Sequence, residues 1–283
     1  MGFLSFAAIG RRAAENIHWA YVFKPTVPAQ GTAGFFIDLN QSSGVPKYNP
    51  FSGSALTATE LVGVGNLGVY AGNFLSGRSK HLLSMQFLQL TAANGPPDYV
   101  YLLDYLMFYA LVDTDDQSEQ VMDNPITLPR YNDGRIVLIV QSPLASTAPM
   151  TITYTNQDGV SGRTATANII PGTAIGLVAS GIGTGGGAGQ ATPFFPLADG
   201  DSGVRSIQSV TMLGSGGGFV CAAIVKPLAT LPILEASVSL EKQLPIFGQY
   251  PPEIKEGACL NFIIQRGGTG TGAYRAELLF VNS

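Results

Sequence analysis

The chain has 283 residues, a net charge of −4 and a pI near 5.1. Charged residues are only 12% of it, against roughly a quarter in typical soluble domains. An acidic chain lacks the basic face that phosphate neutralisation requires, so composition excludes nucleic-acid binding as its main task. With so few charges, part of the surface is expected to be covered by other chains, as in obligate assemblies.

The chain begins MGFLSFAAIGRRAAEN. Its apolar part precedes Arg11 and Arg12, the reverse of the order in a secretory signal, and it is shorter than the ~20 residues that span a bilayer. We therefore expect no membrane association and interpret the segment as a short N-terminal arm that packs on its own domain or on a neighbour. Its candidate inserting residues are Phe3, Leu4 and Phe6.

Three aromatic residues follow at a spacing of two, namely Trp19, Tyr21 and Phe23. This period places them on one face of a strand. We interpret that face as part of the core, and a sugar-binding platform is the alternative. The two histidines, His18 and His81, are likewise interpreted as core residues.

Further strands are predicted in the first half of the chain. Residues 34–39 (GFFIDL) form the first good strand signal after the aromatic segment. Residues 80–90 (KHLLSMQFLQL) suit a helix or a strand with one buried face. Residues 98–112 (DYVYLLDYLMFYALV) favour a strand containing a kink, because Val, Tyr and Phe prefer strands.

The clearest local signal is a hairpin in the middle of the chain. Residues 135–140 form a β-branched run, and residues 150–156 (MTITYTN) alternate strictly between apolar and polar. Asp158-Gly159 supplies a tight turn, after which residues 163–169 return as the antiparallel partner. Later strands are predicted at 173–180, 204–213, 218–225, 235–240, 258–265 and 274–281.

Short strands separated by Gly and Pro turns indicate a mainly β fold, either an antiparallel β-sandwich or a jelly-roll-like arrangement. Two β subdomains are compatible with the length. We place the boundary near residues 124–133, which gives a β-rich region with its arm at 1–125 and a sandwich at 126–283.

An acidic tract, DTDDQSEQVMDN, follows the most aromatic strand. Carboxylate oxygens are the ligands that Ca²⁺ prefers, so a structural calcium ion is one hypothesis for this tract, although the EF-hand pattern fails. The other is a solvated turn or an intersubunit salt-bridge patch with Arg130. No other metal or cofactor is expected. The calcium candidates are Asp113, Asp115, Asp116 and Glu119.

Three further motifs are interpreted as structural. Gly200-Asp201-Ser202-Gly203 matches the nucleophile motif of chymotrypsin-like proteases, but no histidine in that family's sequence context accompanies it, so we predict a tight polar turn. The glycines from Gly181 to Gly189 match a dinucleotide fingerprint without the helix that it needs. Cys221 and Cys259 lie in apolar runs and are predicted to be buried thiols, with a disulfide as the alternative.

The middle of the chain resembles a group of tailed-phage virion structural proteins. The likeness is carried by LLDYLMFYALVDTDDQSEQVMDN, LPRYNDG and TITYTNQDGVSGRT, which span residues 102–164, about a fifth of the chain. The resemblance implies a place in the virion, assembled in the host cytoplasm, and it brings no catalytic residues. We therefore expect no enzymatic activity.

The leading hypothesis is a capsid decoration (cement or head-spike) protein that binds copies of itself and other virion proteins, above all the major capsid protein. It would clamp capsid subunits by burying apolar terminal and loop residues across their seams. A tail component (tube, baseplate or fibre anchor) is the first alternative, and a host-surface or glycan-binding module is the second. The loop candidates are Phe194 and Phe195, which lie between two prolines.

Overall fold

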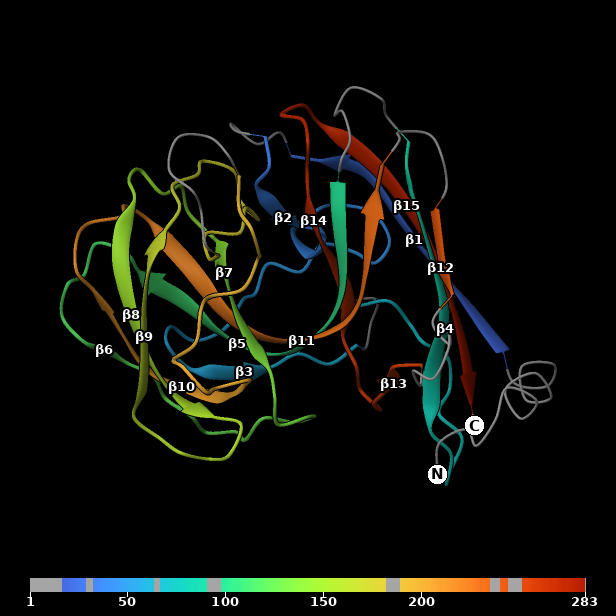
Figure 1. Ribbon diagram of the computed structural model, residues 1–283, viewed down its shortest axis with the longest axis horizontal. Coiled ribbons are helices and arrows are strands. Elements are labelled where there is room, and N and C mark those ends of the chain that lie inside the picture. Colours follow the sequence, from blue (N-terminus) through green and yellow to red (C-terminus); the bar gives the residue numbers. More distant parts are fainter. Residues whose placement is uncertain are drawn as a thin grey trace.

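The computed structural model describes residues 17–28, 33–63, 67–90, 98–181, 189–234, 240–243 and 251–282. Within these ranges the chain forms three antiparallel sheets and no α-helix, which confirms the predicted mainly β sandwich class (Figure 1). No helix in the described ranges is long and apolar enough to cross a membrane.

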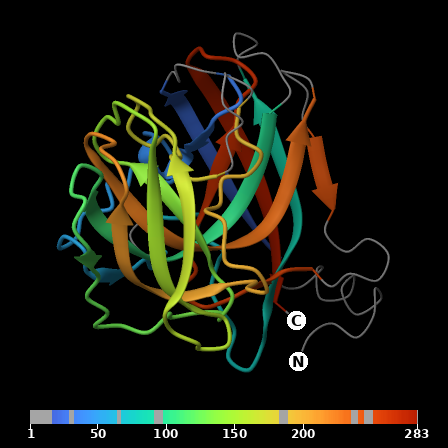
Figure 2. The same cartoon turned by 60° about the vertical axis from the view of Figure 1, so that its left-hand side comes forward.

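The central sheet has the strand order β2-β14-β5-β11-β7, with β3 paired to β5. Its two long strands, β5 (Asp98–Asp113) and β11 (Phe219–Ile233), curve from one outer sheet to the other in Figures 1 and 2. Its strands are β2 (Phe36–Asp38), β3 (Ala58–Glu60), β5 (Asp98–Asp113), β7 (Arg135–Val140), β11 (Phe219–Ile233) and β14 (Leu260–Gln265).

Two smaller sheets pack at the two ends of β5 and β11. The β1 sheet has the order β1-β15-β4-β12 with β13 paired to β4, and the β8 sheet has the order β6-β10-β8-β9. The β1 sheet contains β1 (Ile17–Val27), β4 (Lys80–Gln89), β12 (Leu240–Gln243), β13 (Glu253–Ile254) and β15 (Gly272–Asn282). The β8 sheet contains β6 (Gln120–Val121), β8 (Ala148–Asn156), β9 (Arg163–Ile169) and β10 (Val204–Met212).

Three hydrophobic clusters hold these layers together. Leu102 packs in a cluster with the β1 sheet, whereas Leu106 packs in a cluster with the β8 sheet, so β5 contributes to both cores. Leu103 and Tyr105 alternate with them and belong to a third cluster, which loop residues such as Phe51 complete. Burial of both faces explains why β5 is apolar along nearly its whole length.

One extended segment links the two edges of the central sheet. Residues 176–179 exchange hydrogen bonds with β2 through Phe36 and Asp38 and with β7 through Leu138 and Val140. The predicted strand at 173–180 is therefore wrong as a regular strand, because this segment forms isolated bridges between two edges instead of a continuous ladder. It protects both edges from pairing with other chains.

Each of the three sheets contains strands from both sides of residue 125. The division into regions 1–125 and 126–283 therefore separates strands that are hydrogen-bonded to each other, and it stays a prediction. The predicted strand at 235–240 lies almost wholly outside the described residues. The segment 80–90 suits a helix or a strand in sequence, and its residues 80–89 form β4.

Candidate docking surface

The most distinctive exposed feature is a row of large apolar side chains on the edge strand β1. Ile17, Trp19, Tyr21 and Phe23 are 47%, 40%, 57% and 45% exposed, and Val45, which bridges Phe23, is 57% exposed. We call these five residues the apolar stripe. Their spacing of two puts the four β1 residues on the outer face of the β1 sheet.

The interpretation of Trp19, Tyr21 and Phe23 as core residues is therefore wrong. The alternate residues of β1 face inward instead, because Ala20 and Val22 are buried in the core shared with the central sheet. Both faces of this strand are apolar, so alternation alone did not identify the buried one. The larger side chains lie outside, where a protein without a partner usually places polar residues.

A buried lysine fixes this orientation of β1. The Lys24 Nζ donates hydrogen bonds to the Ser42 carbonyl oxygen at 2.9 Å and to the Pro46 carbonyl oxygen at 2.6 Å. Burial lowers the pKa of Lys24 to about 8, although the neighbouring Asp38 opposes this shift. Burial also raises the pKa of Asp38 to about 7, against the hydrogen bonds that it accepts from the Asn40 amide and the Tyr105 hydroxyl.

The loop that carries these carbonyls also covers the end of the stripe. The Phe23 amide donates to the Val45 carbonyl and the Val45 amide donates to the Phe23 carbonyl, each at 2.8 Å. Gly44 makes this approach possible, because it has φ +126° and an added Cβ would lie 2.1 Å from the Phe23 oxygen. Beyond Phe23 the edge of β1 is thus occupied by its own chain.

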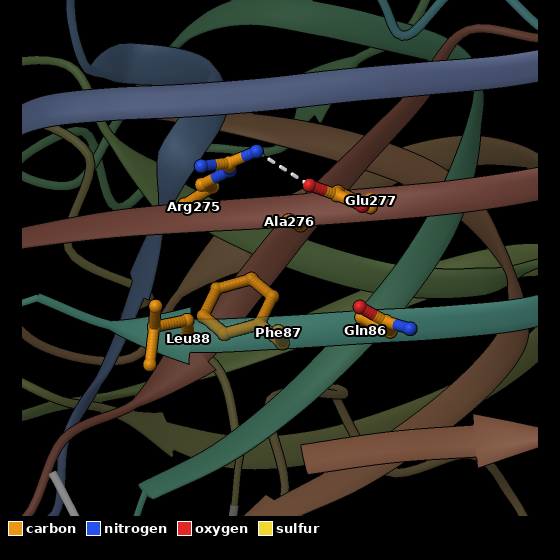
Figure 3. Close-up of a pocket in the computed structure, with 6 residues that line it drawn as sticks. All are labelled: Gln86, Phe87, Leu88, Arg275, Ala276 and Glu277. Atoms are coloured by element: carbon orange, nitrogen blue, oxygen red, sulfur yellow. Dashed lines mark hydrogen bonds and ion pairs between the residues drawn. The ribbon is translucent and has the colours of Figure 1, made fainter. Parts of the chain in front are cut away.

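A shallow hollow of about 200 Å³, lined by both polar and apolar residues, lies beside the stripe, between β4 and β15 (Figure 3). The register places Glu277 between Tyr21 and Gln86, and Arg275 between Phe23 and Leu88. Arg275 and Glu277 form an ion pair at 2.6 Å. The outer face of the β1 sheet therefore combines an apolar edge with a polar centre whose charges neutralise each other.

The two histidines differ in their surroundings. His81 is buried, as predicted. His18 is half-buried, packs edge-on against Tyr70 with 5.4 Å between ring centroids, and places its Nε2 3.1 Å from the Tyr70 carbonyl oxygen. Neither residue lies in a cluster that could hold a metal ion within the described ranges.

Arg130 does not lie at the surface, so its proposed role in an intersubunit salt bridge is wrong for this chain. Its Nε and Nη2 donate to the two carboxylate oxygens of Asp104, each at 3.0 Å. Its Nη2 also donates to the carbonyl oxygens of Leu61 and Tyr105 at 2.9 Å. The Asp104 carboxylate is fully buried, and the guanidinium compensates a charge that the interior could not otherwise hold.

Phe194 and Phe195 are also buried and are therefore not free to insert into a neighbouring subunit. Phe194 packs edge-on against Tyr101, with 5.7 Å between ring centroids, and the Arg135 guanidinium lies over its ring. Phe195 belongs to the core between the central and β8 sheets. Phe3, Leu4 and Phe6 lie outside the described residues, so their assignment as inserting residues stays a prediction.

The acidic tract is used for turns and loop anchoring. The Asp113 carboxylate accepts from the Asp115 amide at 2.9 Å, and the Asp115 carboxylate accepts from the Gly217 amide at 2.9 Å. Hydrogen bonds from Ser215 and Ser118 lower the pKa of Asp115 and Asp116, respectively. Among the described residues no group of three His, Cys, Asp or Glu side chains is arranged to hold a metal ion. Calcium binding by Asp113, Asp115, Asp116 and Glu119 stays a hypothesis.

The Gly200-Asp201-Ser202-Gly203 segment is a polar turn, as predicted. The Asp201 carboxylate accepts hydrogen bonds from Tyr154 at 2.6 Å, from Asn156 at 2.8 Å and from Arg163 at 2.8 Å. The Arg163 and Tyr154 hydrogen bonds lower the pKa of Asp201 to about 2. These contacts tie the turn to β8 and β9.

The two cysteines are buried thiols, as predicted. Cys221 and Cys259 are both free and do not form a disulfide with each other.

Comparison with known proteins gives no family. No protein-family model matches the chain, and no curated protein matches it. The chain is similar at 10% identity to the VP2 protein of infectious bursal disease virus in T=1 particles, with a TM-score of 0.22 over 94% of this chain and 77% of that chain. A structure of the Gx strain of the same virus gives 10% identity and a TM-score of 0.19 over 94% and 80%. TM-scores this low support no conclusion about fold or function.

Proposed function

We propose that this chain is a structural component of a tailed-phage virion, and more specifically a capsid decoration protein that binds the major capsid protein and copies of itself. It would assemble into the virion in the host cytoplasm and act without catalysis. The resemblance of residues 102–164 to phage virion proteins supports the class, and the low share of charged residues supports extensive contact with other chains.

The observation that carries the proposal is the apolar stripe. Single exposed apolar residues are ordinary, but a contiguous row of five on one edge is typical of a protein contact surface. Trp and Tyr are also the residue types that contribute most to such contacts. The stripe replaces Phe194, Phe195 and Arg130, which are buried, as the described surface where this chain would meet a neighbouring subunit.

Deletion of the gene from the phage that encodes it tests the proposal. A decoration protein is dispensable for shell assembly but stabilises the filled shell, so the deletion should give tailed particles that release DNA at a lower temperature than wild-type particles. Electron microscopy and a heat-release assay measure the two properties. Particles with unchanged heat stability would contradict a decoration role. Tailless heads would also contradict it and would favour the tail alternative.

Glycan binding is a second candidate, favoured by the exposure of Trp19 and Tyr21 next to the hollow whose polar lining residues are Gln86, Arg275 and Glu277. Aromatic faces stack on the apolar faces of sugars, and the neighbouring polar groups match sugar hydroxyls. Titration of the isolated chain with host cell-wall oligosaccharides, followed by the fluorescence of Trp19, tests it. Saturable quenching that Gln86→Ala abolishes would support this candidate, and no change in emission would exclude it.

A further inference from the structure

The edge of β1 offers backbone hydrogen-bonding groups as well as apolar side chains. The amide and carbonyl of Phe23 point away from β15, because both are bonded to Val45 on the opposite side. Backbone groups of a strand alternate in direction with a period of two, and no bulge interrupts β1 between Ile17 and Lys24. The amides and carbonyls of Trp19 and Tyr21 therefore also point away from β15.

Within the described part of the chain, no residue supplies a backbone partner for Trp19 or Tyr21 on this side. An unpaired row of this kind is a template for another strand. The chain protects other edges: residues 176–179 bond to β2 and β7, and β9 exposes the polar side chains of Thr164, Thr166 and Asn168. On β1 the protective features, Lys24 and Pro25, come only after Phe23, where the loop already covers the edge.

We infer that a second copy of this chain pairs with β1 edge to edge, in antiparallel orientation, through a two-fold axis at Trp19. The inference rests on the proposed function insofar as it names the partner at the apolar stripe. In this register Trp19 of one copy lies opposite Trp19 of the other, and Ile17 of each copy lies opposite Tyr21 of the other. The two-fold axis thus gives three residue pairs, and each pair exchanges two backbone hydrogen bonds.

The stripe suits its own copy better than it suits a charged partner. Its five side chains carry no charge, so two stripes meet without like-charge repulsion, and a two-fold contact brings the same patch together from both sides. A register centred on Trp19 also keeps the second strand clear of Val45, which blocks the edge only beside Phe23. The joined strands would make one continuous sheet across the two copies.

The contact area predicts a weak dimer. Large side chains such as these bury about 150–250 Å² each when fully covered, so the exposed fractions of Ile17, Trp19 and Tyr21 leave at most on the order of 200–350 Å² per copy for the contact. This area is below the ~800 Å² per partner of a standard interface. Such a pair is expected to dissociate on dilution and to form where copies are concentrated, as on a particle surface.

Trp19 is the single tryptophan of the chain, so its fluorescence reports directly on this contact. As the concentration of the purified chain rises from about 1 to 200 µM, we expect the emission maximum to shift to shorter wavelength. Sedimentation equilibrium should show the mass rising in parallel from 29.6 kDa toward twice that value. A mass and an emission maximum that stay constant would overturn the inference, as would a mass that passes beyond the dimer.

Two variants separate strand pairing from general stickiness. Tyr21→Pro removes an amide that points off the edge and leaves the hydrogen bonds to β15 in place, and Tyr21→Lys places a charge opposite Ile17 of the second copy. Both should remain monomeric over the whole range. Val121→Lys is the matched control, because Val121 is 67% exposed on the edge strand β6 of another sheet, and it should dimerise like the wild type.

Circular dichroism verifies that each variant is folded. The concentration series of the wild-type chain tests the inference even if a variant does not fold. Dimerisation of Tyr21→Pro and Tyr21→Lys at the wild-type concentration would overturn the inference. A monomeric chain that is nevertheless abundant in virions would reject the self-pairing and leave the proposed function standing. A dimer that is absent from virions would do the reverse.

Discussion

Arg130 gives the sharpest prediction about what holds the fold together. Arg130→Ala removes the only described cation that contacts the buried Asp104 carboxylate, and it also removes the hydrogen bonds to the Leu61 and Tyr105 carbonyls. Breaking a buried ion pair from one side costs about 3–5 kcal/mol, because the other charge is left without compensation. We expect the free energy of unfolding at neutral pH to fall by that amount.

The loss should depend on pH with a defined sign. Burial already raises the pKa of Asp104 above the ordinary value of an aspartate, and Arg130 opposes this shift. Without the guanidinium the folded-state pKa of Asp104 rises further, so the folded chain holds the proton more tightly than the unfolded chain. Its stability is then fully present below pH ~4 and decreases as pH rises toward the new pKa. Arg130→Ala should therefore cost less at pH 4 than at pH 7.

Urea unfolding followed by circular dichroism measures both effects. Arg275→Ala is the matched control, because Arg275 also pairs with a carboxylate but is about half exposed, and it should cost at most about 1 kcal/mol. Adding Asp104→Asn to Arg130→Ala should restore part of the stability, since no charge is then left buried. Equal losses for the two arginine variants, or a loss at Arg130 that is the same at pH 4 and pH 7, would refute the reasoning.

Three further expectations follow from buried and paired groups. Phe195→Ala should lower the free energy of unfolding by about 3–5 kcal/mol in urea denaturation, and unchanged stability would contradict its place in the core. The low pKa of Asp201, about 2, means that its contribution is present above pH ~4 and is lost as pH falls through 2, so wild type and Asp201→Asn should converge in urea midpoint near pH 2, and a constant difference would contradict this. Burial raises the pKa of the Cys221 and Cys259 thiols, so neither should react with an aromatic disulfide reagent near pH 8 until urea is added, and rapid labelling of the folded chain would contradict their burial.

Local sequence signals predicted the strands of the central hairpin closely. The runs at 135–140 and 163–169 coincide with β7 and β9, and residues 150–156 lie within β8. In each case alternation or β-branching is bounded by a turn signal such as Asp158-Gly159, and Gly159 indeed has a positive φ. These features depend on neighbours in the sequence, so no knowledge of distant contacts was needed.

The candidate site was harder to predict, because its residues are placed by distant segments. The strand of Trp19, Tyr21 and Phe23 was evident from its period of two, but its buried face depends on Lys24 and on carbonyl oxygens about 20 residues away. Nothing in the sequence near Lys24 identifies those acceptors. A strand that is apolar on both faces at a sheet edge was the available signal for an intermolecular contact.

The errors at Arg130 and Phe194 have the same origin. Charged side chains are seldom buried without a partner, so the sequence predicts a surface position for Arg130, whereas its partner Asp104 lies 26 residues earlier in β5. The prolines around Phe194 predict an exposed loop, yet that loop covers the face of the central sheet that carries Tyr101. Burial of loops over a curled sheet is a long-range property.

The copy number of this chain in purified virions, from quantitative mass spectrometry against the major capsid protein, tests the central claim most directly. A decoration protein repeats with the symmetry of the shell, so we predict a ratio near one or a simple fraction such as one third. A ratio of a few per cent would contradict the decoration role and place the chain at the tail, neck or vertices. Absence from virions would contradict the virion proposal altogether.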